Sequence, residues 1–171
     1  MKSVRIVSKV LFYLTRTLAI SYMLVFVYAF ISSSINTQAF RLVENGSRFE
    51  ISYPFTDTPF LLGYNNMGYI NTMLMVFGLY ALFFYLLSNV FLTFSQAKLF
   101  TQKGLRHLKQ FYISNFTLPL LALLIASIIS EVEGAAEALV ALHILLGVFA
   151  YFIAAIFQQG LKLQHEQDLF I

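Results

Sequence analysis

Four long stretches of this chain contain no Asp, Glu, Lys or Arg. They are residues 17–40, 58–97, 110–130 and 138–161. A helix crosses the hydrocarbon core of a bilayer with about 20 apolar residues, so each stretch is long enough for one crossing. Only 11% of all residues are charged, against about 25% in a typical soluble domain. The sequence therefore excludes an ordinary soluble domain and predicts an integral membrane protein.

The predicted fold class is all-α integral membrane, an antiparallel four-helix transmembrane bundle in a single domain of residues 1–171. Backbone polar groups in lipid must be satisfied within a helix or a closed barrel, and these stretches do not alternate as barrel strands do. The expected spans are residues 10–31, 69–95, 111–131 and 138–158, with an outer segment at 32–68, an inner loop at 96–110 and a tail at 159–171. We interpret the first span as uncleaved, because its apolar run is long for a signal peptide.

Basic residues gather on one side of this predicted bundle. The inner loop contains Lys98, Lys103, Arg106 and Lys109 without an acid. Loops rich in Lys and Arg stay in the cytoplasm, so both termini are expected there. Arg16 is expected to extend to the headgroups from the inner end of the first span. The turn between the last two spans contains only acids, Glu131, Glu133 and Glu137. A solvated turn is favoured there over a site for a divalent cation.

The outer segment contains an Asn45-Gly46 pair, the strongest short signal for a β-hairpin. A two-residue turn at that pair aligns Phe40 with Ile51, Arg41 with Glu50 and Leu42 with Phe49. We therefore predict a small extracytoplasmic hairpin whose apolar face rests on the helices or on the membrane surface. A lid over helix ends is favoured over a receptor surface.

The inner loop and the tail are the candidate contact surfaces. Thr101 is a plausible N-cap for a short basic amphipathic helix in the loop. The tail ends in Leu169-Phe170-Ile171, and burial of such residues is worth about 1.5–3 kcal/mol each. We expect residues 158–171 to pack against the loop. The candidate residues for contact with a partner or with anionic lipid are Lys98, Lys103, Arg106, Lys109, Glu166 and Asp168.

Inside the spans, His143 is the one ionisable side chain far from the ends. A hydrogen bond to a neighbouring helix is favoured over haem ligation, because no second histidine lies at the same depth. The sequence predicts no catalytic, cofactor-binding or metal-binding residue. Small residues let helices approach closely in lipid. We expect two such stripes to meet between the last two spans: Ala122, Ala126 and Ser130 on one, and Gly147, Ala150 and Ala154 on the other.

Several stretches resemble a known family. They are Leu99-Phe100-Thr101 and Gly104-Leu105-Arg106-His107-Leu108 in the loop, and the ending from Ile156 through Gly160 to Asp168-Leu169-Phe170-Ile171. This pattern resembles the bacterial four-span membrane family catalogued as domain of unknown function 2975. The sequence departs from that family at Phe170, where a threonine is common, and in its longer outer segment. The resemblance implies no reaction, but it implies a bacterial inner membrane and, as a possible partner, a small cytoplasmic helix-turn-helix regulator.

The functional hypothesis is a non-enzymatic regulatory or accessory subunit that acts through the inner loop and tail. Its expected partners are the lipid bilayer and either that regulator or another membrane subunit. The alternative is a small transporter or channel subunit, active as a homo-oligomer whose pore contains polar residues such as Asn71, Ser88 and Asn89. A formal charge of +3 is too small to indicate direct binding of nucleic acid.

The orientation is testable because the chain contains no cysteine. Single cysteines at Ser3, Ser47 and Glu133 should differ in labelling by a membrane-impermeant thiol reagent in intact cells. We expect labelling at Ser47 and Glu133 and protection at Ser3. Labelling at Ser3, or protection at both other sites, would contradict the predicted orientation.

Overall fold

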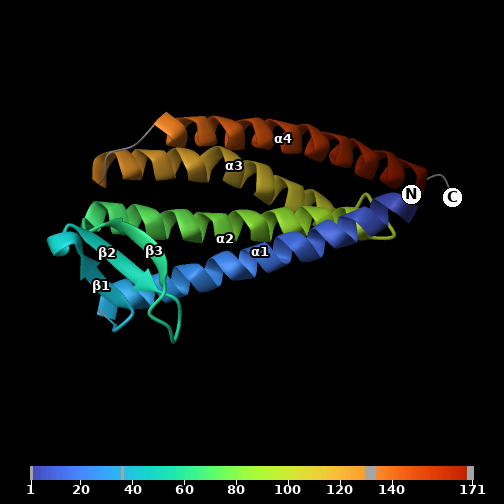
Figure 1. Cartoon of the computed structure of the whole chain (residues 1–171). Helices are drawn as coiled ribbons and strands as arrows, with labels where there is room; N and C mark the ends of the chain where they lie inside the picture. The colour runs from blue at the N-terminus through green and yellow to red at the C-terminus, as the bar shows by residue number, and fades with distance from the viewer. Residues whose placement is uncertain (1, 36, 130–133, 169–171) are drawn as a thin grey trace.

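The computed structural model describes residues 2–35, 37–129 and 134–168. The elements in chain order are α1 (Lys2–Ile35), β1 (Phe40–Val43), a 3-10 turn η1 (Glu44–Gly46), β2 (Arg48–Ser52), β3 (Pro59–Tyr64), α2 (Met67–Ser95), α3 (Gln102–Ile129) and α4 (Gly134–Asp168). All four α-helices are long and apolar enough to cross a membrane. They run antiparallel in the order α1, α2, α3, α4, with both termini at one end and the sheet at the other (Figure 1). We call these the terminal end and the sheet end.

The helices are longer than the predicted spans, and their additional turns consist largely of the polar residues that flank the apolar stretches. α1 begins at Lys2 rather than near residue 10, and α4 continues through the predicted tail to Asp168. The predicted amphipathic helix of the loop is not a separate element but the first turns of α3. Thr101 begins it as expected, because its Oγ1 accepts a hydrogen bond of 3.0 Å from the Gly104 amide.

An aromatic cluster joins α1 to α2. The Tyr22 ring lies 5.6 Å from the Tyr80 ring and 5.5 Å from the Phe84 ring, measured between centroids. Further along the same interface, Gly78 allows the Phe26 ring to lie against the α2 backbone. Aromatic pairs at these distances contribute about 0.5–1.5 kcal/mol beyond the burial of their area. These contacts therefore determine which turns of α1 lie against which turns of α2.

A second core joins α2, α3 and α4 near the terminal end. Its buried residues are Leu86 and Val90 of α2, Leu105, Leu108 and Phe111 of α3, and Ala150, Ala154 and Phe157 of α4. The Phe157 ring contacts both Phe94 and Phe100 edge-on, at 5.5 Å and 5.2 Å. Apolar side chains at the start of α3 thus join the helix core.

The predicted hairpin is confirmed in register. β1 and β2 pair Phe40 with Ile51, Arg41 with Glu50 and Leu42 with Phe49. Asn45 and Gly46 have φ of +57° and +86°, and the Ser47 amide donates to the Glu44 carbonyl at 3.2 Å. Positive φ at both central residues is the geometry that favours Asn-Gly in such turns.

Two features of the sheet were not predicted. A third strand, β3, pairs antiparallel with β2, so the element is a three-stranded sheet. Arg41 forms its ion pair with Asp57, from the loop before β3, and not with the facing Glu50. Glu50 is the cross-strand partner of Arg41 on β2, but the Asp57 carboxylate pairs with the exposed guanidinium from the loop.

The sheet packs on the helices at the sheet end. Phe49 and Ile51 are fully buried with Ala29 of α1 and with Ile70 and Leu74 of α2. The Tyr28 hydroxyl also donates to the Ser52 carbonyl at 2.6 Å. The apolar face of the sheet therefore covers the ends of α1 and α2.

Gly63 of β3 should be the position in this sheet least tolerant of a side chain. A Cβ there would lie 2.3 Å from Tyr69 Cε1 and 2.7 Å from Phe49 Cε1. We predict that Gly63→Ala lowers the free energy of unfolding in detergent by about 1–3 kcal/mol, the usual cost of overpacking.

Gly134→Ala is the matched control, because a Cβ at Gly134 would have no atom within 4 Å. Equal stability of the two variants, measured by denaturant titration, would contradict this packing of the sheet.

Candidate functional site at the terminal end

Residues 96–101 join α2 to α3 and bring basic side chains to a cavity of about 310 Å³. Lys98 comes from this connection, and Lys103 and His107 come from the first turns of α3. Thr93 of α2 completes the wall between them. The Gly104 position has no room for a side chain, because a Cβ would lie 2.4 Å from Thr93 Cγ2. This close approach of α3 to α2 sets the position of the two lysines.

Arg16 of α1 bonds inside the helix assembly, instead of extending away from it to headgroups as predicted. Its Nη2 donates to Asn89 Oδ1 of α2 at 2.8 Å. Its guanidinium also lies 4.4 Å from the centroid of the Tyr85 ring. A hydrogen bond and a cation–π contact together keep the charge next to α2.

His107 extends this polar cluster from α2 to α3. Its Nδ1 lies 3.2 Å from Thr93 Oγ1 and 3.1 Å from the Asn89 carbonyl oxygen. The Thr93 hydroxyl donates to that same carbonyl at 3.0 Å, so both oxygens are acceptors for the imidazole. Nδ1 must then hold the proton of a neutral imidazole.

Sequence reasoning missed this cluster of Arg16, Asn89, Thr93 and His107. These residues are up to 91 positions apart in the chain. Asn89, Thr93 and His107 lie near helix ends, where polar residues are common and do not stand out. The one available signal was the position of Arg16, a cation within the first predicted span near its inner end, which needs a polar partner or access to the headgroups.

The end of α4 packs against the connection between α2 and α3. The Phe100 ring lies over Gly160, where a Cβ would be only 2.7 Å from Phe100 Cδ1. Beside this contact, a groove of about 850 Å³ separates the start of α3 from the end of α4. Lys109 lines one side of the groove, and Lys162, His165 and Glu166 line the other.

Of the two acidic candidate residues of the tail, the structure describes the side chain of Glu166 alone. Glu166 pairs with Lys162, one turn earlier on its own helix, at 3.9 Å, and not with the loop. Asp168 is the last residue of α4, and the structure does not describe its side chain. The apolar residues 169–171 also lie outside the described residues.

The loop lysines and arginine have no carboxylate partner within the described part of the chain. Lys98, Lys103, Arg106 and Lys109 are all exposed. At the sheet end, by contrast, Arg41 pairs with Asp57 and Arg48 pairs with Glu44. Unpaired cations are therefore concentrated at the terminal end.

His143 of α4 contacts a neighbouring helix, as the sequence predicted. Its Nδ1 lies 2.8 Å from Asn115 Oδ1 of α3. Its ring also meets Phe83 of α2 edge-on, at 5.0 Å between centroids. One histidine thus links three helices.

The two stripes of small residues lie at different levels and do not meet as predicted. Gly147 packs against Phe116, and Ala150 and Ala154 are buried in the core with Leu105 and Leu108. Ala122 and Ala126 instead line a cavity beside Ala136 and Leu139. The antiparallel course of α3 and α4 offsets the stripes, so small residues of α4 receive large side chains of α3. Ser130, Glu131 and Glu133 lie outside the described residues.

No family model, curated protein or solved structure matches this chain. The resemblance to domain of unknown function 2975 stays a prediction.

The bond between Arg16 and Asn89 should stabilise the contact of α1 with α2. Asn89→Leu removes the acceptor of a charged group, and such hydrogen bonds are worth about 1.5–3 kcal/mol. We expect a loss of that size in the free energy of unfolding, measured by titration with SDS in mixed micelles. Asn71→Leu, at an exposed position of the same helix, should change it by less than about 0.5 kcal/mol.

The double variant Arg16→Met, Asn89→Leu separates this bond from general packing. It should lose less stability than the sum of the two single variants, because each single variant leaves the other group unpaired. Strict additivity would show that the two side chains are not coupled.

Proposed function

We propose that this protein is a four-span protein of the bacterial inner membrane, with its terminal end in the cytoplasm and its sheet outside. Exposed apolar side chains on the outer helices support the membrane placement. Leu24 of α1 is 65% exposed, and Phe149 and Phe152 of α4 are 58% and 57% exposed. A soluble protein rarely leaves apolar patches of this extent in water, whereas lipid solvates them.

The charge distribution supports the proposed orientation. The cations of the terminal end are Lys2, Arg5, Lys9, Lys98, Lys103, Arg106, Lys109 and Lys162. Basic segments next to apolar helices stay on the cytoplasmic side. The sheet end contains Arg41 and Arg48, each paired with an acid, so it has little unpaired positive charge.

We propose further that the protein is a non-enzymatic regulatory or accessory subunit, and that its terminal end binds an acidic segment of a partner. The observation that supports this most is the cavity lined by Lys98, Lys103 and His107. Its cations lack carboxylate partners among the described residues. Thr93 and Asn89 hold the imidazole of His107 in place. An anionic group in this cavity would complete the ion pairs that the chain itself does not supply.

The transporter alternative receives less support. Of the three candidates for a polar seam in an oligomer, Asn71 is exposed, but Ser88 and Asn89 are buried inside one chain. Ser88 donates to the Tyr85 carbonyl at 2.6 Å, and Asn89 accepts from Arg16. Side chains used in this way do not line a pore between subunits.

The test uses the full chain in nanodiscs of phosphatidylcholine and a fluorescent peptide of eight glutamates. We expect saturable binding by anisotropy that weakens as salt is added. Each removed cation should cost about 1 kcal/mol at low salt. The double variant Lys98→Gln, Lys103→Gln should therefore bind about 30-fold more weakly.

The matched control is Arg41→Gln, Arg48→Gln, which removes two cations from the sheet end and should leave binding unchanged. Equal loss in both double variants would indicate attraction by net charge alone and would contradict a site. Loss of peptide binding in discs that contain phosphatidylglycerol would show that anionic headgroups, not a protein partner, occupy the basic face.

A further inference from the structure

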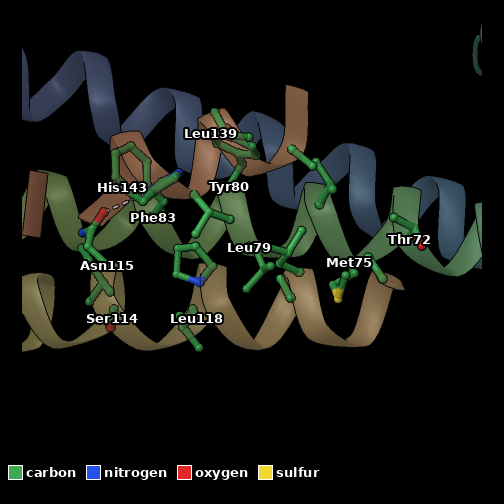
Figure 2. Close-up of a pocket in the computed structure, with 18 residues that line it drawn as sticks. Thr72, Met75, Leu79, Tyr80, Phe83, Ser114, Asn115, Leu118, Leu139 and His143 are labelled. Carbon is green, nitrogen blue, oxygen red and sulfur yellow. Dashed lines mark hydrogen bonds between the residues drawn. The ribbon is translucent and has the colours of Figure 1, made fainter. Parts of the chain in front are cut away.

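A second cavity, of about 150 Å³, lies between α2, α3 and α4 in the half of the molecule nearer the sheet (Figure 2). Its walls are almost entirely apolar, and the described residues that line it include no Asp, Glu, Lys or Arg. Residues that form these walls include Met75, Leu79, Leu118, Pro119, Leu123 and Leu139. A volume of this size can accommodate a benzene ring. A charged ligand would lose its hydration there without gaining a partner.

One end of the cavity is polar, where His143 and Asn115 meet (Figure 2). Asn115 is only 3% exposed, and its Nδ2 donates to the Phe111 carbonyl at 2.9 Å. That bond fixes the amide so that Oδ1 faces His143 Nδ1, 2.8 Å away. An amide oxygen only accepts, so Nδ1 must donate. The neutral imidazole then has its lone pair on Nε2, which is its one acceptor atom.

Two aromatic side chains of α2 lie beside His143 and line the cavity with it. The centroids of Phe83 and Tyr80 lie 5.0 Å and 6.1 Å from that of His143. Aromatic side chains favour edge-on and offset contacts with another ring at such distances. Pro119, one turn after Asn115, has no amide hydrogen, so the Asn115 carbonyl lacks its helical donor and is a second acceptor on α3.

We propose that this cavity binds a neutral, membrane-soluble phenol. The phenol hydroxyl donates a hydrogen bond to His143 Nε2, and its ring lies among Phe83, Tyr80 and the apolar wall. The ligand enters from the surrounding lipid, because the part of the lining that the structure describes contains no charged group. This site is separate from the basic cavity at the terminal end. The binding of a phenol and the binding of the proposed partner can therefore be tested independently.

The experiment compares three ligands that share an ethyl-substituted ring and differ only at the para position: 4-ethylphenol, 4-ethylanisole and ethylbenzene. Binding to the full chain in phosphatidylcholine nanodiscs is measured by equilibrium dialysis, with empty nanodiscs as the correction for partition into lipid. The anisole keeps the oxygen but cannot donate, and a single hydrogen bond is worth about a threefold to tenfold difference in affinity. We expect the phenol to bind that much more tightly than both other ligands.

Variants locate the site. His143→Phe keeps a ring but removes the acceptor, and it should abolish the preference for the phenol. Ala122→Leu fills the cavity and should weaken binding of all three ligands. His165→Phe, an exposed position on the same helix, is the matched control and should bind as the unchanged protein does.

Three results would overturn the proposal. Equal affinity for the phenol and the anisole in the unchanged chain would show that no donated hydrogen bond exists, and this comparison needs no variant. Equal binding of all three would indicate a site for acyl chains. No binding beyond partition into lipid would show that the cavity takes no such ligand.

Discussion

Every other layer of this fold packs on α2. α1 meets it through the rings of Tyr22, Tyr80 and Phe84, and the sheet covers its first turns at Ile70 and Leu74. α3 and α4 share its core near the terminal end. α2 is thereby the most enclosed of the four helices, while α1 and α4 expose long apolar faces. A central apolar helix with its neighbours on different sides fixes the position of both the basic cavity and the internal one.

The sequence alone predicted the elements that depend mainly on residues close together in the chain. Charge-free stretches predicted four helices, and Asn45-Gly46 predicted the hairpin and its register, because that turn imposes positive φ. β3 was missed since its residues Phe60-Leu61-Leu62 do not alternate between apolar and polar. Pairing with β2 and burial beside α2 make this segment a strand, and neither can be found from a local pattern.

The candidate site was predicted only in part, because some of its contacts also depend on residues that are distant in the sequence. The loop cations and the bond of His143 to a neighbouring helix followed from charge and burial. The Arg16–Asn89 pair and the bonds of His107 depend on which turns of three helices lie side by side. The small-residue stripes failed as a predictor of register, because Gly147 accommodates Phe116 as readily as another small residue. In lipid, a small residue indicates that another helix packs closely against it, but it does not predict which residue of that helix makes the contact.

The membrane placement of the exposed apolar faces is the claim on which the functional account depends. Spin labels at Leu24, Ile125 and Phe149, exposed positions on three of the helices, can be tested in nanodiscs for collisions with oxygen and with a water-soluble nickel chelate. A label at Thr56, in the loop before β3, serves as the reference in water. The account predicts that the three helix labels collide with oxygen and are inaccessible to nickel, while Thr56 shows the reverse. Nickel accessibility at all three helix positions would contradict it.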